Sequence, residues 1–212
     1  MTEDAAGEVL LAPALDYASR LAARLTLADL DRPSACAGWT VAEVLVHLTE
    51  SLRFLASSLI SGVVPAQVAE PSPGPVTVGT LCRDLGRAGA CLTAAARDLR
   101  GRRSVALDGV PLHCHHLIVV GAVEAAAHGW DAAAGVCRGW SIPDDLAARL
   151  LAELPLVIDG ETRQGVFADP IVSPPDRPAA ERLLAALGRD ARAGPSRRSR
   201  PIPFAGRRCP SQ

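Results

Sequence analysis

The chain contains no lysine, so all 22 of its basic side chains are arginines. Their distribution is uneven. Residues 191–212 hold six arginines and no acid, and because the whole chain has a net charge of −1, the residues before them carry −7. A broad basic surface of the kind that binds nucleic acid is therefore not expected.

Long apolar runs are also lacking. No stretch reaches the roughly 18 apolar residues that a membrane-spanning helix needs, and the run over residues 117–127 is interrupted by Glu124. The N-terminal residues include Glu3 and Asp4 where a secretory signal has a basic segment before an apolar one. We therefore expect a soluble, cytoplasmic protein without a membrane partner.

No cysteine pair has the C-x-x-C spacing, and in a reducing cytoplasm scattered cysteines act mostly as small buried apolar side chains. The G-x-S-x-G, G-x-x-x-x-G-K and G-x-G-x-x-G motifs are missing too, which removes the usual signatures of serine hydrolases, nucleotide hydrolases and dinucleotide-dependent enzymes. The six cysteines are Cys36, Cys82, Cys91, Cys114, Cys137 and Cys209.

The apolar residues, 49% of the chain, recur mainly at helical spacing, and no long stretch alternates at period two. This pattern predicts an all-α protein, a four-helix bundle with short C-terminal helices and an extended segment. One domain over residues 1–190 is expected, followed by an Arg/Pro/Ser-rich tail, 191–212, with too little apolar content to order itself. The expected helices are 8–27, 40–59, 78–99, 111–134, 143–156 and 178–187, with a turn-rich crossing at 100–109 and an extended or loop segment containing Phe167, Ile171 and Val172.

Two local patterns in the expected helices are informative. Thr40 and Glu43 have the T-x-x-E spacing of a capping box, which predicts that a helix starts sharply at Thr40. Glu124 and His128 are four residues apart, so their side chains lie on one face of a helix, one turn apart.

Glu124 lies in the most apolar helix of the chain, where burying an unpaired carboxylate costs several kcal/mol. A nearby cation is therefore expected, although most isolated E-x-x-x-H pairs are ordinary surface pairs. Small residues on the same face predict a lined cavity beside the pair: Gly121, Ala125 and Ala132. A third metal ligand must come from another helix, and His47 is the best candidate. Periodicity does not decide whether the His47 side chain points into the core or toward solvent, because it lies roughly 120° from the centre of the leucine stripe and could be exposed.

Two motifs resemble those of the DinB-like metal-binding domain of mycothiol-dependent maleylpyruvate isomerases. The first is Cys36-Ala-Gly-Trp39-Thr40 followed by Val46-His47-Leu48, and the second is E-A-A-A-H-G-W-D over residues 124–131. Phe167-Ala-Asp-Pro170 and Leu187-Gly-Arg-Asp190 are similar to the ending of short members, so the resemblance covers about residues 10–190. It implies a DinB-like bundle in which His47, Glu124 and His128 are the metal ligands.

The resemblance also implies a chemistry. Three such ligands leave one coordination position open, as in catalytic zinc sites, although nickel or iron would also be accepted. In the family that position is associated with the thiol mycothiol, and a divalent cation lowers the pKa of a bound thiol. The thiolate could add to an electrophilic substrate carbon, giving isomerisation or S-transfer. The full isomerases carry a further C-terminal domain, for which residues 158–190 are too short, so maleylpyruvate itself is not implied.

Other residues could assist the metal site. Asp131 could orient a ligand imidazole, touch substrate, or simply cap or solvate the helix end. Trp39 and Trp130 could line the cavity or pack in the hydrophobic core. Cys36 is a possible nucleophile. The consecutive residues 113–116 cannot easily converge on one ion. Of these, His113 is expected on the Glu124 face near the pocket mouth and His115 on the opposite side, unless both are merely solvated.

We therefore expect a metal-dependent transferase or isomerase that acts on a small electrophile with mycothiol as cosubstrate. Two alternatives stay open. One is an enzyme of specialised metabolism that uses the metal as a Lewis acid without a thiol, and the other is a non-enzymatic metal-binding module. The sequence leaves the oligomeric state open, a dimer included.

Overall fold

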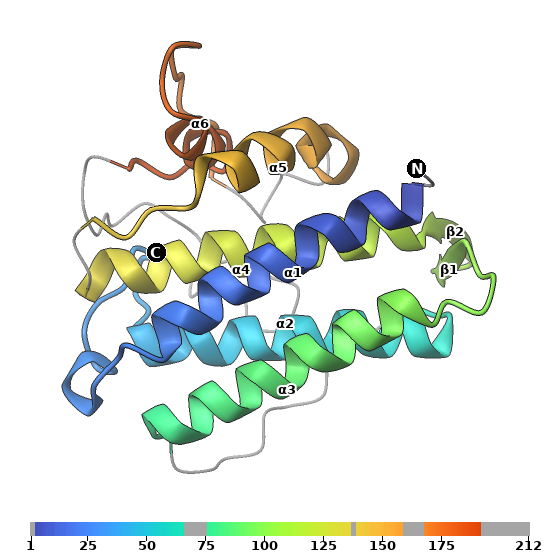
Figure 1. Ribbon diagram of the computed structural model, residues 1–212, viewed down its shortest axis with the longest axis horizontal. Helices are drawn as coiled ribbons and strands as arrows, with labels where there is room; N and C mark the ends of the chain where they lie inside the picture. The colour runs from blue at the N-terminus through green and yellow to red at the C-terminus, as the bar shows by residue number, and fades with distance from the viewer. Residues whose placement is uncertain (1–2, 66–75, 137–138, 159–167, 192–212) are drawn as a thin grey trace.

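The bundle is built from four long helices, followed by two short ones (Figure 1). A computed structural model describes residues 3–65, 76–136, 139–158 and 168–191. The elements are α1 (Glu3–Ala22), the 3-10 turn η1 (Leu27–Asp29), α2 (Val41–Ser61), α3 (Val78–Arg97), β1 (Ser104–Leu107), β2 (Val110–His113), α4 (Cys114–Val136), α5 (Asp144–Val157) and α6 (Ala179–Ala186). The predicted all-α class is confirmed.

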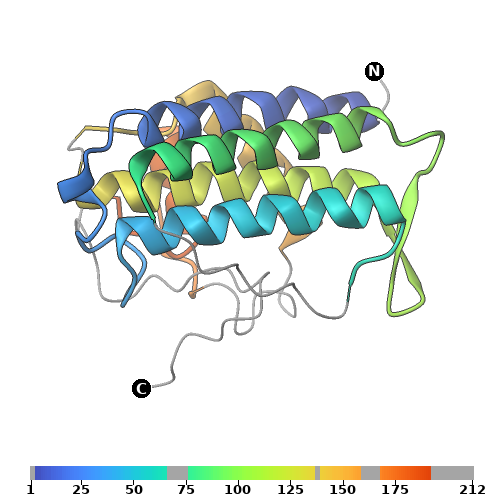
Figure 2. The same cartoon turned by 90° about the horizontal axis from the view of Figure 1, so that it is seen from below.

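The four long helices run along one common axis, as the two perpendicular views show (Figures 1 and 2). Helix α4 packs against α1 and α2, and α3 contacts the same two helices from the other side of the core. Helix α5 lies against α4 and α1, and α6 lies against α5. The contact between α2 and α4 therefore brings together the two helices that carry the predicted metal ligands.

Helix α4 is the central helix of the core. It is long and apolar enough to cross a membrane by length and composition, but 89% of its most apolar window is buried inside the protein. Leucines fill the space beside Gly121, where an added Cβ would meet the side chains of Leu92, Leu55 and Leu11. The expected cavity at Gly121 is therefore wrong, because this glycine admits close packing.

Helix α2 begins as predicted. The hydroxyl of Thr40 accepts from the backbone N–H of Glu43 at 3.2 Å, and the Glu43 carboxylate accepts from the backbone N–H of Thr40 at 2.8 Å. The helix ends at Ser61 and is capped by Gly62, whose positive φ of 79° suits a residue without a side chain. This start determines where His47, in the second turn of the helix, points.

A β-hairpin replaces the predicted turn and the start of the predicted fourth helix. Strands β1 and β2 pair antiparallel from Ser104↔His113 to Leu107↔Val110. Asp108 and Gly109, both with positive φ, form the two-residue turn between them, and Asp-Gly is a typical hairpin signal. The expectation of a helix from residue 111 is wrong, because this local turn makes the chain pair with itself before α4 starts at Cys114.

The other element boundaries differ less from the predicted ones. Helix α1 ends at Ala22 rather than at residue 27, with η1 following. Ile171 and Val172 lie in a segment without regular structure, as expected. Phe167, Cys137, Cys209 and all of the predicted tail except Ala191 lie outside the described residues, so the tail stays a prediction.

The loop before α2 touches α4 at Gly135. A Cβ at this position would clash with the backbone carbonyl oxygen of Pro33, which cannot swing away as a side chain can. We expect Gly135→Ala to lower the free energy of unfolding by about 1–3 kcal/mol, measured by urea denaturation. Gly86→Ala is the matched control, because Gly86 is exposed in α3 with no atom within 4 Å of an added Cβ. It should stabilise the protein by about 0.5–1 kcal/mol, and equal effects of the two changes would contradict the predicted contact.

Candidate metal centre

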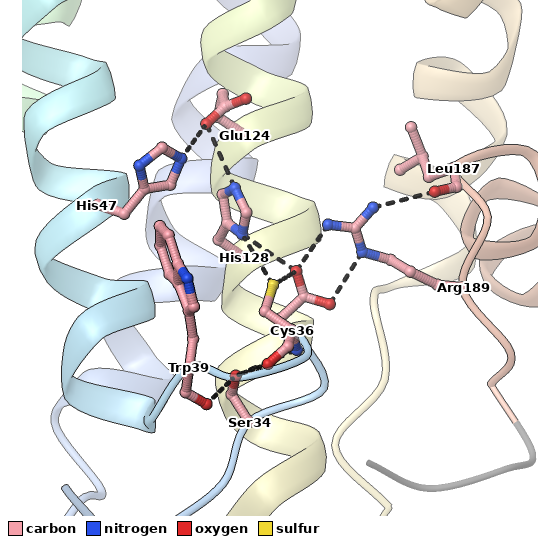
Figure 3. A network of polar contacts seen from close by, with 9 residues as sticks. Ser34, Cys36, Trp39, His47, Glu124, His128, Leu187 and Arg189 are labelled. Carbon is pink, nitrogen blue, oxygen red and sulfur yellow. Dashed lines mark hydrogen bonds and ion pairs between the residues drawn. The ribbon is translucent and has the colours of Figure 1, made fainter. Parts of the chain in front are cut away.

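The three predicted ligands converge at the interface between α2 and α4 (Figure 3). Oε2 of Glu124 lies 3.5 Å from Nε2 of His128 and 3.9 Å from Nε2 of His47. All three side chains are buried, with at most 4% exposed. The alternatives of an exposed His47 and of a surface Glu124–His128 pair are therefore wrong, because the packing of α2 on α4 encloses both helix faces.

These donors fit a divalent ion. Both oxygens of Glu124 and Nε2 of His128 are buried and have no hydrogen-bond partner among the described residues. Ligand atoms about 2.0–2.1 Å from a tetrahedral zinc ion lie about 3.4 Å apart, close to the two distances from Oε2 of Glu124. Two imidazoles and one carboxylate suit zinc, nickel or iron. Burying the Glu124 carboxylate without a counter-charge costs free energy, so a positive charge in the cluster would stabilise it.

The other ring nitrogen of His128 is held by a second carboxylate. Nδ1 of His128 lies 3.0 Å from Oδ2 of Asp131, one turn later on α4. A proton on Nδ1, shared with Asp131, leaves Nε2 to face Glu124 and His47. Such carboxylate–histidine pairs orient metal ligands in many proteins. Asp131 is fully buried, so the alternative that it solvates the helix end is wrong.

The carboxylates around His128 favour a positive charge at its ring. Burial alone would lower the pKa of His128, but its contacts with Asp131, Cys36 and Glu124 together raise that pKa well above its ordinary value. Burial would likewise raise the pKa of Asp131, but the charge of Arg189 and hydrogen bonds from His128 and Arg189 hold it far below its ordinary value. The carboxylate of Asp131 is therefore ionised and attracts a proton or cation to His128.

Arg189 is the site residue that reasoning from the sequence missed. Its Nε donates to Oδ1 of Asp131 at 2.9 Å and its Nη2 donates to Oδ2 at 2.7 Å, although the two residues are 58 positions apart. The side chain is 1% exposed, and its Nη1 also donates to the carbonyl oxygen of Leu187. The only sequence signal was the Leu187-Gly-Arg-Asp190 resemblance, which carried no role for the arginine.

Cys36 contacts the same carboxylate. Its Sγ lies 3.1 Å from Oδ2 of Asp131 and 4.0 Å from Nδ1 of His128. Cys36, His128 and Asp131 could by distance form a second ion-binding group, but both oxygens of Asp131 already accept from the cationic Arg189. Burial, together with the charge of Asp131, raises the pKa of the Cys36 thiol to about 11. The thiol is therefore protonated at neutral pH.

The remaining predicted residues lie at different places. Trp39 packs edge-on against His47, with ring centroids 5.0 Å apart, so it lies beside the cluster. His113 is exposed in β2, and the helical register that placed it on the Glu124 face is absent there. His115 is buried rather than solvated, and its Nε2 lies 3.0 Å from Oε2 of Glu153 on α5. The role of His113 stays a prediction.

Comparison with known proteins agrees with this architecture. Two crystal structures of the mycothiol-dependent maleylpyruvate isomerase, one of them of a mutant with a histidine replaced by alanine, have the same fold, each with a TM-score of 0.58. They share 18% and 19% sequence identity with this chain, and each match covers 87% of this chain and 80% of the other. The DinB-like fold implied by the resemblance is thereby confirmed.

The family is shown by a match over the first four helices. Residues 11–133 match the family described as the mycothiol maleylpyruvate isomerase N-terminal domain. The likeness to the two crystal structures covers more of the chain than these residues, so it includes part of the region after α4. A search of curated proteins found no significant match. Because residues 11–133 make up more than half of the chain, the protein belongs to this family.

Proposed function

We propose that this protein is a divalent-metal-dependent enzyme that uses a small thiol, mycothiol in the first place, for S-transfer to or isomerisation of a small electrophilic substrate. The observation that carries the proposal is the buried carboxylate of Glu124, without a hydrogen-bond partner among the described residues and aimed at His47 and His128. Membership of the mycothiol maleylpyruvate isomerase family supports the choice of thiol.

His47, Glu124 and His128 would hold the ion and leave one coordination position for a further ligand. A divalent ion held there, zinc or else nickel or iron, would lower the pKa of a thiol that binds to it, so that the thiol would ionise near neutral pH. Asp131 holds Nδ1 of His128 and thereby directs Nε2 toward Glu124. The burial of all three ligands excludes bulk water from the cluster. A cytoplasmic location and a small-molecule partner remain part of the proposal.

Metal content and thiol binding test the proposal together. Protein purified without chelator should contain about one divalent ion per chain by mass spectrometry, and His47→Ala should contain much less, since one of only three ligands is lost. Protein loaded with Co²⁺ should then show a new thiolate-to-cobalt absorption when mycothiol is added. The same addition to His47→Ala should leave the spectrum unchanged.

The alternatives give different outcomes. Wild-type protein that binds none of zinc, nickel and iron would reject the metal centre. An enzyme that uses the ion as a Lewis acid would bind metal, show no thiol absorption and convert an oxygen-containing substrate without thiol. A non-enzymatic module would bind metal and leave electrophiles such as maleylpyruvate unchanged, with or without mycothiol.

A further inference from the structure

Cys36 lies where the loop before α2 meets α4. Oδ2 of Asp131 faces three donor groups: Nη2 of Arg189 at 2.7 Å, Nδ1 of His128 at 3.0 Å and Sγ of Cys36 at 3.1 Å. Both oxygens of Asp131 accept hydrogen bonds from the cationic Arg189, and the S–H of Cys36 donates to Oδ2 of the same carboxylate. Besides Arg189, Cys36 therefore also contacts the Asp131 carboxylate, which holds the predicted metal ligand His128.

The loop that carries Cys36 is also attached to both ligand-bearing helices. The backbone N–H of Ala35 donates to the carbonyl oxygen of Asp131 at 2.9 Å, next to the thiol contact. Three residues after Cys36, Trp39 packs edge-on against His47 on α2, and the backbone N–H of Trp39 donates to the carbonyl oxygen of Cys36. The loop therefore links Asp131 on α4 to His47 on α2.

The surroundings of Cys36 do not suit a nucleophile. The residue is 1% exposed, and its sulfur faces the Asp131 carboxylate and the ring of His128, on the side of the ring away from Glu124. An attacking thiolate at this position would lie against a carboxylate, and substrate would have to displace the packed loop. These surroundings argue against the possibility that Cys36 is a nucleophile and favour a different role.

We propose that Cys36 is a positioning residue of the metal centre, whose thiol donates to Asp131 and thereby holds both the His128 ring and the loop that packs on His47. This inference rests on the proposed metal site. The thiol remains intact, and its hydrogen bond limits how far Asp131 and His128 can turn. Removing the donor should loosen the ligand geometry more than it loosens the fold.

The test is Co²⁺ binding to the full chain, because the visible absorption of Co²⁺ reports the geometry of its ligands. Cys36→Ala should weaken Co²⁺ binding about tenfold, the lower end of effects seen for residues that support metal ligands, and should change the band positions. Cys36→Ser keeps a donor and should recover most of the affinity and the wild-type bands. Cys82→Ala, at a half-buried free cysteine on α3, is the control and should change neither.

Thermal unfolding without metal separates this role from a purely structural one. A merely structural Cys36 would lower the melting temperature of Cys36→Ala and leave the Co²⁺ bands of the remaining folded protein as in wild type, which would overturn the proposal. Equal losses of affinity in Cys36→Ala and Cys36→Ser would also overturn it. If Cys36→Ala does not fold, Cys36→Ser tests the proposal, which requires this variant to fold and to bind Co²⁺. Wild-type protein that binds no Co²⁺ contradicts the proposed function itself, which is a distinguishable result.

Discussion

Replacing Arg189 with methionine is expected to lower the free energy of unfolding by about 3–5 kcal/mol, the usual effect of removing one partner of a buried ion pair. Asp131 is fully buried and accepts two hydrogen bonds from Arg189. Without the guanidinium, this carboxylate keeps its desolvation cost but loses its strongest counter-charge. Urea denaturation of metal-free protein measures the effect without a contribution from bound ion.

Arg177→Met is the matched control for this prediction. Arg177 also pairs with a carboxylate, that of Glu181, but these side chains are 32% and 30% exposed. Solvent screening limits such a pair to about 1 kcal/mol or less. A loss at Arg189 no larger than the loss at Arg177 would show that the Asp131–Arg189 pair does not hold the C-terminal segment on α4.

Zinc is expected to stabilise the wild-type protein and to leave Glu124→Gln almost unchanged. Ligand at about a thousand times its dissociation constant adds about 4 kcal/mol to the free energy of unfolding when it binds only the folded state. Glutamine has nearly the shape of glutamate but lacks the negative charge that faces His47 and His128. The melting temperature with and without zinc, measured for each variant, gives the result.

Glu153→Gln controls for the loss of a carboxylate beside a histidine. Glu153 lies 3.0 Å from His115 and outside both groups of side chains close enough to hold an ion among the described residues. Its variant should keep the full zinc-induced rise in melting temperature. The metal centre is disproved if zinc raises the melting temperature of Glu124→Gln as much as that of wild type.

Local sequence signals predicted the parts of the fold that depend on near neighbours. The capping box identified Thr40 as the start of α2, because its hydrogen bonds span only three residues. The Asp108-Gly109 turn is an equally local signal for the hairpin, but the prediction placed residues 100–109 in a turn-rich crossing and started a helix at residue 111. A cavity cannot be predicted from Gly121 alone, because a small residue permits either a cavity or close packing. The neighbours that fill the space, Leu92 and Leu55, come from other helices.

By itself, the sequence determined that Glu124 and His128 lie one turn apart on the same side of a helix, because four residues make slightly more than one turn. Tertiary structure decided what surrounds them. The packing of α2 on α4 turned His47 inward, although its angle to the leucine stripe left both directions open. The convergence of Cys36 and Arg189 on Asp131 joins residues 95 and 58 positions apart. No periodicity encodes such contacts, because they exist only once the loop before α2 and the C-terminal segment have packed against α4.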